Sequence, residues 1–300
     1  NRIRIKIGGH TETTLVVLLT KFFLLILIGY ILRKTHTISS RLEKDLGAFL
    51  MRVILPFSIL RSANTTFDPG MSLNLAHAAL FAVAFYAFAI AALILIMRFT
   101  KLQETTKKIF VTLGTFQNVG FLGFPITEEL YGPTGLIYTV IFNLVFQFFF
   151  LGFAQTYISG KRQNVVRSIL TDPGIVASFL AIPLFVSPVK LPNVIADCFQ
   201  LMGSMMTPIS LLIIGCRMTS IRFLSLFTDG LAWILTAVRL AVLPTIAALV
   251  LKPLRLDPTL TAVLIMVCGL PSGAMNVILA NEYDCDVNLA SKTVALSTFI

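Results

Sequence analysis

The sequence is poor in charge and in the residues that build catalytic centres. Only 13% of its 300 residues are charged, whereas a soluble globular protein has roughly one quarter, so most of this surface cannot face water. Its three histidines are scattered and give no sign of a catalytic triad. The four cysteines lack CxxC or metal-ligand spacing, and we interpret them as small apolar residues in helices. We therefore expect no enzyme, no metal and no cofactor.

Long apolar runs replace the missing charge. Hydrophobic residues make up 56% of the chain, and apolar runs near the roughly 20 residues that a bilayer requires recur along it. These runs predict an all-α polytopic membrane protein with the lipid bilayer as its environment. The net charge of +10 lies in short Lys and Arg clusters between the runs. That pattern indicates topology signals and lipid headgroup contact, so we expect no nucleic-acid partner.

Apolar runs bounded by charge, Gly or Pro predict ten transmembrane spans. A tail, residues 1–12, precedes them, and because the last span is short we expect the chain to stop inside its final helix. The ten spans cover residues 13–32, 39–61, 73–98, 107–127, 133–158, 173–188, 193–216, 229–251, 259–281 and 287–300.

The distribution of basic residues predicts an orientation. Thirteen Lys and Arg residues lie at joints that follow odd-numbered spans, and four lie at joints that follow even-numbered spans. Even with three more in the tail, at Arg2, Arg4 and Lys6, the excess places the odd joints in the cytoplasm and both termini outside. The expected location is a bacterial cytoplasmic membrane.

The longest internal joint, the basic segment 159–172, divides the spans into five and five. The two halves, 13–158 and 173–300, have helix-breaking residues at similar positions. Pro56 corresponds to Pro208 in mid-span, and Pro125 corresponds to Pro271. Five spans per half is an odd number, so the second half must lie upside down relative to the first. This pattern favours the inverted-repeat plan of secondary transporters.

One span in each half carries its own helix breakers. A proline inside a helix costs about 3 kcal/mol, and freed backbone groups in hydrocarbon cost several kcal/mol more. Such breaks must therefore line a polar cavity inside the protein, and half-helix N-termini there suit a carboxylate. The candidate substrate-binding residues are Gln117, Asn118, Gly120, Gly123 and Pro125 in "QNVGFLGFP", and Pro271, Ser272, Gly273 and Asn276 in "LPSGAMN".

A simpler interpretation exists for each feature. A single Pro or Gly in a membrane helix is usually a packing kink, and Gln117 can be a core amide bonded to a neighbouring helix. The repetition of the whole set in the second half favours a functional site.

Four charged residues are candidate charge partners of that site. Arg239 lies in mid-span, and a buried guanidinium must pair with a carbonyl or carboxylate, face water or bind a substrate anion. Arg52 and Lys292 pose the same question. Asp197 is a candidate for proton coupling or simply an acid at the membrane interface.

The order of several motifs resembles the auxin efflux carriers, a family that includes plant auxin exporters and bacterial organic-acid permeases. The resemblance covers residues 13–300 and rests on "FFLLILIGYILRK", "LPFSIL", "NVGFLGFP", "AVRLAVLP" and "LPSGAMNVILANEYDCDVNLASKTVALST". The short central joint is typical of the bacterial-type permeases.

The resemblance implies two inverted five-helix repeats in which helices 4 and 9 cross at unwound centres. It also implies a fixed scaffold against which the crossing helices slide as they carry an organic anion. The family's crossover asparagine corresponds to Asn118, while Asn276 stands where plant members have a proline. Similar proteins commonly form homodimers.

These inferences together predict a secondary transporter of a small mono- or dicarboxylate, coupled to H⁺ or Na⁺. A sodium-coupled bile-acid-type symporter of similar architecture is one alternative. A membrane sensor that uses a transporter fold and binds its ligand without moving it is another.

Overall fold

The computed structural model describes residues 12–64, 69–160, 169–187, 191–219 and 229–300. The predicted tail 1–12, except Glu12, and the middle of the predicted joint 159–172 lie outside the described residues. So do several of the basic residues used to predict the orientation, among them Arg2, Arg4, Lys6 and Arg222.

The described chain is almost wholly helical, and its helices follow the predicted apolar runs. The first half contains α1 (Glu12–Lys34), α2 (Ser40–Phe49), η1 (Leu50–Ile54), α3 (Leu55–Ala63), α4 (Pro69–Arg98), α5 (Glu104–Thr115), η2 (Val119–Gly123), α6 (Phe124–Phe149), η3 (Phe150–Ala154) and α7 (Gln155–Ser159). The second half contains α9 (Pro173–Val186), α10 (Asn193–Ser204), α11 (Met206–Met218), α13 (Gly230–Ala237), η4 (Val238–Val242), α14 (Leu243–Leu251), η5 (Lys252–Leu254), α15 (Pro258–Cys268), α16 (Met275–Glu282) and α17 (Val287–Phe299).

Five helical segments of the described chain are long and apolar enough to cross a membrane: Ser40–Ala63, Met71–Arg98, Val119–Ser159, Asn193–Met218 and Gly230–Leu254. The count of ten spans stays a prediction. At the expected joint between spans 4 and 5, Gly132 has a non-helical backbone with a φ of 62°, which suits a residue without a side chain, so α6 consists of two helical parts that meet there at a kink.

Wide π-helical turns precede three of the prolines. η1, η2 and η4 each end two residues before a proline: Pro56, Pro125 and Pro244. A proline cannot donate the usual hydrogen bond, and its ring clashes with the carbonyl one turn earlier. A widened turn relieves that clash, so these prolines shape the helices without ending them.

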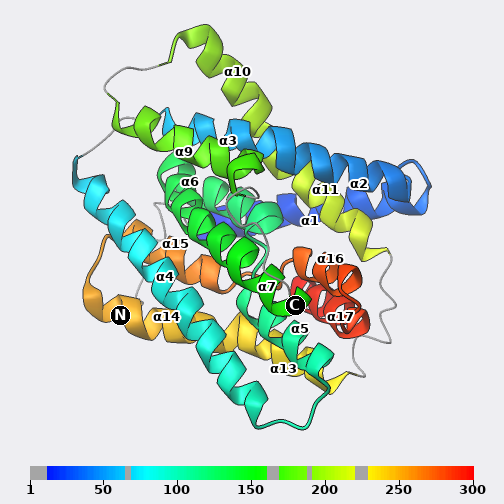
Figure 1. Ribbon diagram of the computed structural model, residues 1–300. Helices are drawn as coiled ribbons and strands as arrows, with labels where there is room; N and C mark the ends of the chain where they lie inside the picture. The colour runs from blue at the N-terminus through cyan, green and yellow to red at the C-terminus, as the bar shows by residue number, and fades with distance from the viewer. Residues whose placement is uncertain (1–11, 65–68, 161–168, 188–190, 220–228) are drawn as a thin grey trace.

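The helices form two groups. The first group consists of α1, α2, η1, α3, α9, α10 and α11, where α1 packs on α11, and α3 packs on α9 and α10. The second group consists of α4 to α7 and α13 to α17 with their π-turns, where α4 packs on α5 and α6, and α15 packs on α6 and α14. Figure 1 shows most of the first group in the upper part of the view and most of the second below it.

In the first helix group, helices of one half of the chain pack on helices of the other half. α1 of the first half packs on α11 of the second, just as α9 of the second half packs on α3 of the first. The contact between α4 and α5 has its counterpart in that between α14 and α15. In these pairs, the helices of the two halves thus have corresponding packing partners.

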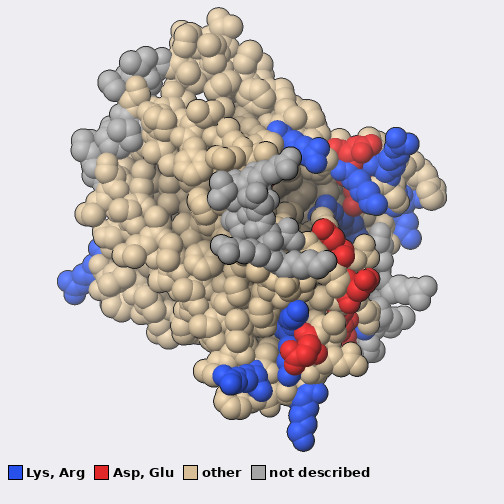
Figure 2. Space-filling model, viewed as in Figure 1, with Lys and Arg blue, Asp and Glu red and all other residues tan. Residues whose placement is uncertain are grey.

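Some of the predicted joints contact one another. The predicted joints after spans 3, 5 and 9 form one such set, and those after spans 2 and 6 form another. The odd set contains the hydrogen bonds of Thr106 with Asp286 and of Lys108 with the Ile158 carbonyl, and the even set contains that of the Leu191 amide with Asn64. Most of the Lys, Arg, Asp and Glu residues visible in Figure 2 lie on the right of the view, where Figure 1 labels α2, α5 and α16.

Candidate functional site

Both predicted breaks are real interruptions of a helix. α5 ends at Thr115, residues 116–118 are not helical, and the Asn118 Oδ1 then accepts a hydrogen bond from the Phe121 amide at 3.2 Å. Asn118 is therefore the N-cap of the following turn, a position for which asparagine is well suited. In the second half, α15 ends at Cys268 and α16 begins at Met275.

The two breaks lie against each other as a short antiparallel pair. The Asn118 amide donates to the Pro271 carbonyl at 2.8 Å, and the Gly273 amide donates to the Phe116 carbonyl at 2.9 Å. Gln117 and Ser272 face each other between these bonds as an isolated β-bridge. The breaks therefore satisfy each other's freed backbone groups, which in an apolar interior is their main requirement.

Gly273 is needed for this close approach. A Cβ built on Gly273 would lie 2.9 Å from the Gln117 carbonyl oxygen and 3.3 Å from that of Phe116. Both neighbours are backbone atoms that already form the pair, so neither can move aside freely. Any larger residue would push the two breaks apart.

Side chains from the second break brace the first. The Asn276 Nδ2 donates to the Phe116 and Gly273 carbonyls, each at 3.0 Å, and the Ser272 Oγ donates to the Leu113 carbonyl at 2.9 Å. The Ser297 Oγ of α17 accepts from the Ser272 amide at 3.2 Å. At the position where plant auxin exporters have a proline, this chain therefore uses an amide that ties the two breaks together.

Arg239, on η4, is fully buried between the ends of the two interrupted helices. Its Nη1 donates to the carbonyls of Gly114 and Thr115, at 3.1 and 3.3 Å. Its Nη2 donates to Cys268 and Leu270, at 3.0 and 2.9 Å, and its Nε donates to Leu270 at 3.3 Å. All five N–H donors of the guanidinium are thereby used. Of the roles considered for a buried arginine, the structure therefore shows pairing with backbone carbonyls.

Several polar atoms around the pair have no protein partner in the described structure. Both amide atoms of Gln117 are buried with no partner at full hydrogen-bond geometry, although the Tyr86 hydroxyl lies close to that amide. The Thr115 Oγ1 and the Asn276 Oδ1 are also buried without a hydrogen bond. The hydroxyl groups of Tyr86, whose ring stacks on Phe116, and of Thr293 are in the same state. A buried unsatisfied polar group costs about 1–3 kcal/mol, so such a concentration calls for a ligand or water.

The remaining glycines and Pro125 of the first break lie on η2 and at the start of α6. A Cβ on Gly120 would approach the end of the Met51 side chain on η1, which belongs to the first helix group. A Cβ on Gly123 would approach Leu270 of the second break. Pro125 is buried near the start of α6, directly after the widened turn of η2 that relieves the clash of its ring.

The other three charge partners expected from the sequence have different surroundings. Lys292 pairs with Asp229 at 3.2 Å, Arg52 is exposed, and Asp197 is exposed on α10. None of them has a hydrogen bond to the residues of the two breaks within the described chain.

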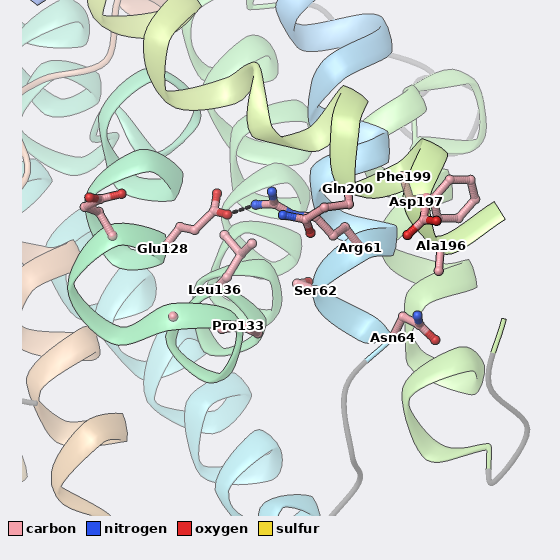
Figure 3. A pocket seen from close by; sticks show the side chains of 12 residues that line it. Arg61, Ser62, Asn64, Glu128, Pro133, Leu136, Ala196, Asp197, Phe199 and Gln200 are labelled. Atoms are coloured by element: carbon pink, nitrogen blue, oxygen red, sulfur yellow. Dashed lines mark ion pairs between the residues drawn. The ribbon is translucent and has the colours of Figure 1, made fainter. Parts of the chain in front are cut away.

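A separate cavity of about 580 Å³ lies on the side of the even joints (Figure 3). Arg61 of α3 and Glu128 of α6 form an ion pair within it, which links the first helix group to the second. Both side chains are mostly buried, with 11% and 22% of their surface exposed. The other lining residues are Ser62, Asn64, Glu129, Gly132, Pro133, Leu136, Ala196, Asp197, Phe199 and Gln200.

Replacement of Glu128 by Gln is expected to destabilise the protein. It leaves the mostly buried guanidinium of Arg61 without its counter-charge, a loss of about 1–3 kcal/mol for a partly buried pair. We expect the melting temperature of purified protein to fall by several degrees. Glu129→Gln is the matched control, because Glu129 lines the same cavity and forms no ion pair with any residue that the structure describes; equal shifts for both variants would contradict the prediction.

The architecture described above is that of a polytopic α-helical membrane protein with two interrupted helices paired in its interior. The family model described as "Membrane transport protein" matches residues 14–165 and 162–300. The chain therefore belongs to this auxin efflux carrier-like family of membrane transport proteins, as the motifs predicted.

Two archaeal proteins are similar over nearly their whole length. An uncharacterized transporter of Methanothermobacter thermautotrophicus is 24% identical over 296 residues, which cover 97% of this chain and 95% of the relative. An uncharacterized transporter of Methanocaldococcus jannaschii is 21% identical over 290 residues, which cover 92% and 91%. Because both are archaeal, they lend no support to the expected bacterial membrane.

Part of the candidate site could not be predicted from the sequence. The polar side chains of Tyr86, Thr115, Thr293 and Ser297 give no signal there, because single Thr, Ser and Tyr residues are common in apolar helices. The one usable signal was periodicity: Thr293 and Ser297 lie one turn apart on α17 and share a face.

Proposed function

We propose that this membrane transporter carries a small organic anion, a mono- or dicarboxylate, and binds it where the two breaks meet. The observation that carries the proposal is the group of unpartnered amides and hydroxyls at the antiparallel pair. The Gln117 amide offers both a donor and an acceptor. The Asn118 Nδ2 has no hydrogen bond in the described structure, since only its Oδ1 serves the cap.

Two helix N-termini support an anionic substrate. η2 and then α6 begin at the first break, and the eight-residue α16 begins at the second. Each N-terminus carries a partial positive charge, which favours a carboxylate. Several of the N–H groups there already have protein partners: Phe121 donates to the Asn118 Oδ1, and Asn276 donates to the Gly273 carbonyl. The residues of the breaks, 116–118 and 269–274, include no acidic side chain that would oppose it.

We further propose that transport proceeds by an elevator-type movement of the second helix group against the first. Both breaks and Arg239 belong to the second group, so the site can move as a unit. Contacts between the groups are concentrated on α6 and η2 on one side, and on α3, α9 and α11 on the other. A limited interface of this kind suits sliding, and crossing helices at the site suit the family's plan.

The exchange of packing partners between the halves supports an inverted repeat. The separation of odd and even joints supports helices that traverse the membrane alternately, and the basic residues favour cytoplasmic odd joints with both termini outside. The coupling ion is proposed to be H⁺ or Na⁺.

Uptake into sealed proteoliposomes tests the proposal. Radiolabelled malonate, malate and indole-3-acetate are offered under an inward proton gradient, an inward sodium gradient and no gradient. We expect saturable uptake of at least one of them, and we expect Asn118→Ala to abolish it because the cap and the free amide are both lost. Ser204→Ala, an exposed position at the end of α10, is the control and should transport normally.

The outcomes separate the alternatives. Uptake that depends on sodium would favour a symporter of the bile-acid type. Saturable binding without flux under every gradient would indicate a sensor instead of a carrier. Asn118→Ala with unchanged binding and flux would remove the site from the two breaks.

A further inference from the structure

The charge of Arg239 affects which ligands the site prefers, although all of its N–H donors are already bonded to backbone carbonyls. The last carbonyls of α5 are accounted for individually: Thr112 accepts from the Phe116 amide, Leu113 from Ser272, and Gly114 and Thr115 from Arg239. Arg239 likewise takes the Cys268 carbonyl at the end of α15. The guanidinium is therefore the cap shared by both helix C-termini.

Helix ends carry partial charges of about half an elementary unit, negative at the C-terminus and positive at the N-terminus. At the paired breaks, two C-termini (α5 and α15) meet two N-termini (η2 with α6, and α16). Taken alone, these four ends cancel and leave no preference for an anion. The full positive charge of Arg239 lies against the two negative ends and removes their effect.

We infer that Arg239 determines the preference of the site for an anion without touching the substrate. With Arg239 included, the net charge at the breaks is about one positive elementary unit, and the two helix N-termini direct the resulting positive potential toward the ligand. Arg239 is thus a positioning and selectivity residue. The inference rests on the proposed function, because it explains how a site with no charged side chain in its breaks selects a carboxylate.

Binding of a carboxylate and of its uncharged amide tests the inference. Purified protein is titrated with the acid taken up in the screen, for example indole-3-acetate, and with the corresponding primary amide, indole-3-acetamide. The measured quantity is the ratio of the two dissociation constants in the wild type and in Arg239→Met, Arg239→Gln and Arg239→Lys. Each variant is first checked by size-exclusion chromatography.

Loss of the charge is expected to lower the preference for the acid about tenfold or more in the Met and Gln variants, since one charge near the site is removed. Arg239→Lys retains the charge but not the planar fork. We expect it to bind both ligands more weakly and to keep the preference for the acid. A purely structural role would weaken acid and amide equally in all three variants.

The Lys variant keeps the test decisive if the uncharged variants do not fold. A folded Arg239→Lys protein that has lost its preference for the acid would overturn the inference, as would an unchanged ratio in folded Arg239→Met. If the wild type takes up no carboxylate at all, the proposed function fails first, and the inference fails with it. If the wild type takes up the acid and the ratio of dissociation constants is unchanged in Arg239→Met, only the role of Arg239 is contradicted.

Discussion

Gly273→Ala is expected to abolish transport while the helices remain folded. The added methyl group would lie 2.9 Å from the Gln117 carbonyl oxygen, which is too close for any relaxed contact. The paired breaks would have to separate, and the bonds of Gly273 with Phe116 and of Asn118 with Pro271 would stretch or break. Each buried bond lost costs about 1–3 kcal/mol, and the substrate-binding groups would lose their geometry.

Uptake of the active substrate in proteoliposomes measures the effect, and we expect a fall of about a hundredfold or more, because displacements near 1 Å at a site have such consequences. Gly230→Ala is the matched control: it makes the same chemical change in the same helix group, but nothing lies within 4 Å of the added Cβ. Normal transport by Gly273→Ala would show that the close approach of the breaks is not required.

The positions of the breaks could be predicted from the sequence because helix breakers and caps act locally. Pro271 lies within the second break, and Asn118 caps the turn that follows the first. Pro125 lies beyond the first break, inside the helix formed by η2 and α6. The partners of the breaks could not be predicted in the same way. The pairing of Gln117 with Ser272 depends on the arrangement of the whole second helix group, and no local pattern contains that information.

Charged residues show the same division. The sequence identified Arg239 as a buried cation that needed partners, and the cost of burying it made that conclusion secure. The identity of its partners depended on the fold: the structure shows five hydrogen bonds from Arg239 to backbone carbonyls. Lys292 looked equivalent in the sequence, yet its partner is Asp229 at the odd joints.

The contact between α1 and α11 depends on two glycines, and Gly215→Ala is expected to prevent stable folding. A Cβ on Gly215 would overlap the Ile26 carbonyl oxygen, and one on Gly29 would overlap that of Leu212. The helix backbones touch directly here, and the Cys216 Sγ donates to the Gly29 carbonyl at 3.3 Å. Small residues permit such an approach in membranes, where close packing replaces the hydrophobic effect as the driving force.

Overpacking usually costs about 1–3 kcal/mol, and more where the neighbour cannot move. A carbonyl group inside a continuous helix cannot move without displacing the helix, so we expect a loss at or above the top of that range. Because α1 and α11 join the two halves within the first helix group, the expected result is aggregated protein on size-exclusion chromatography after detergent extraction. Gly230→Ala should elute as a single peak. A monodisperse Gly215→Ala protein with the melting temperature of the wild type would show that α1 and α11 do not pack this closely.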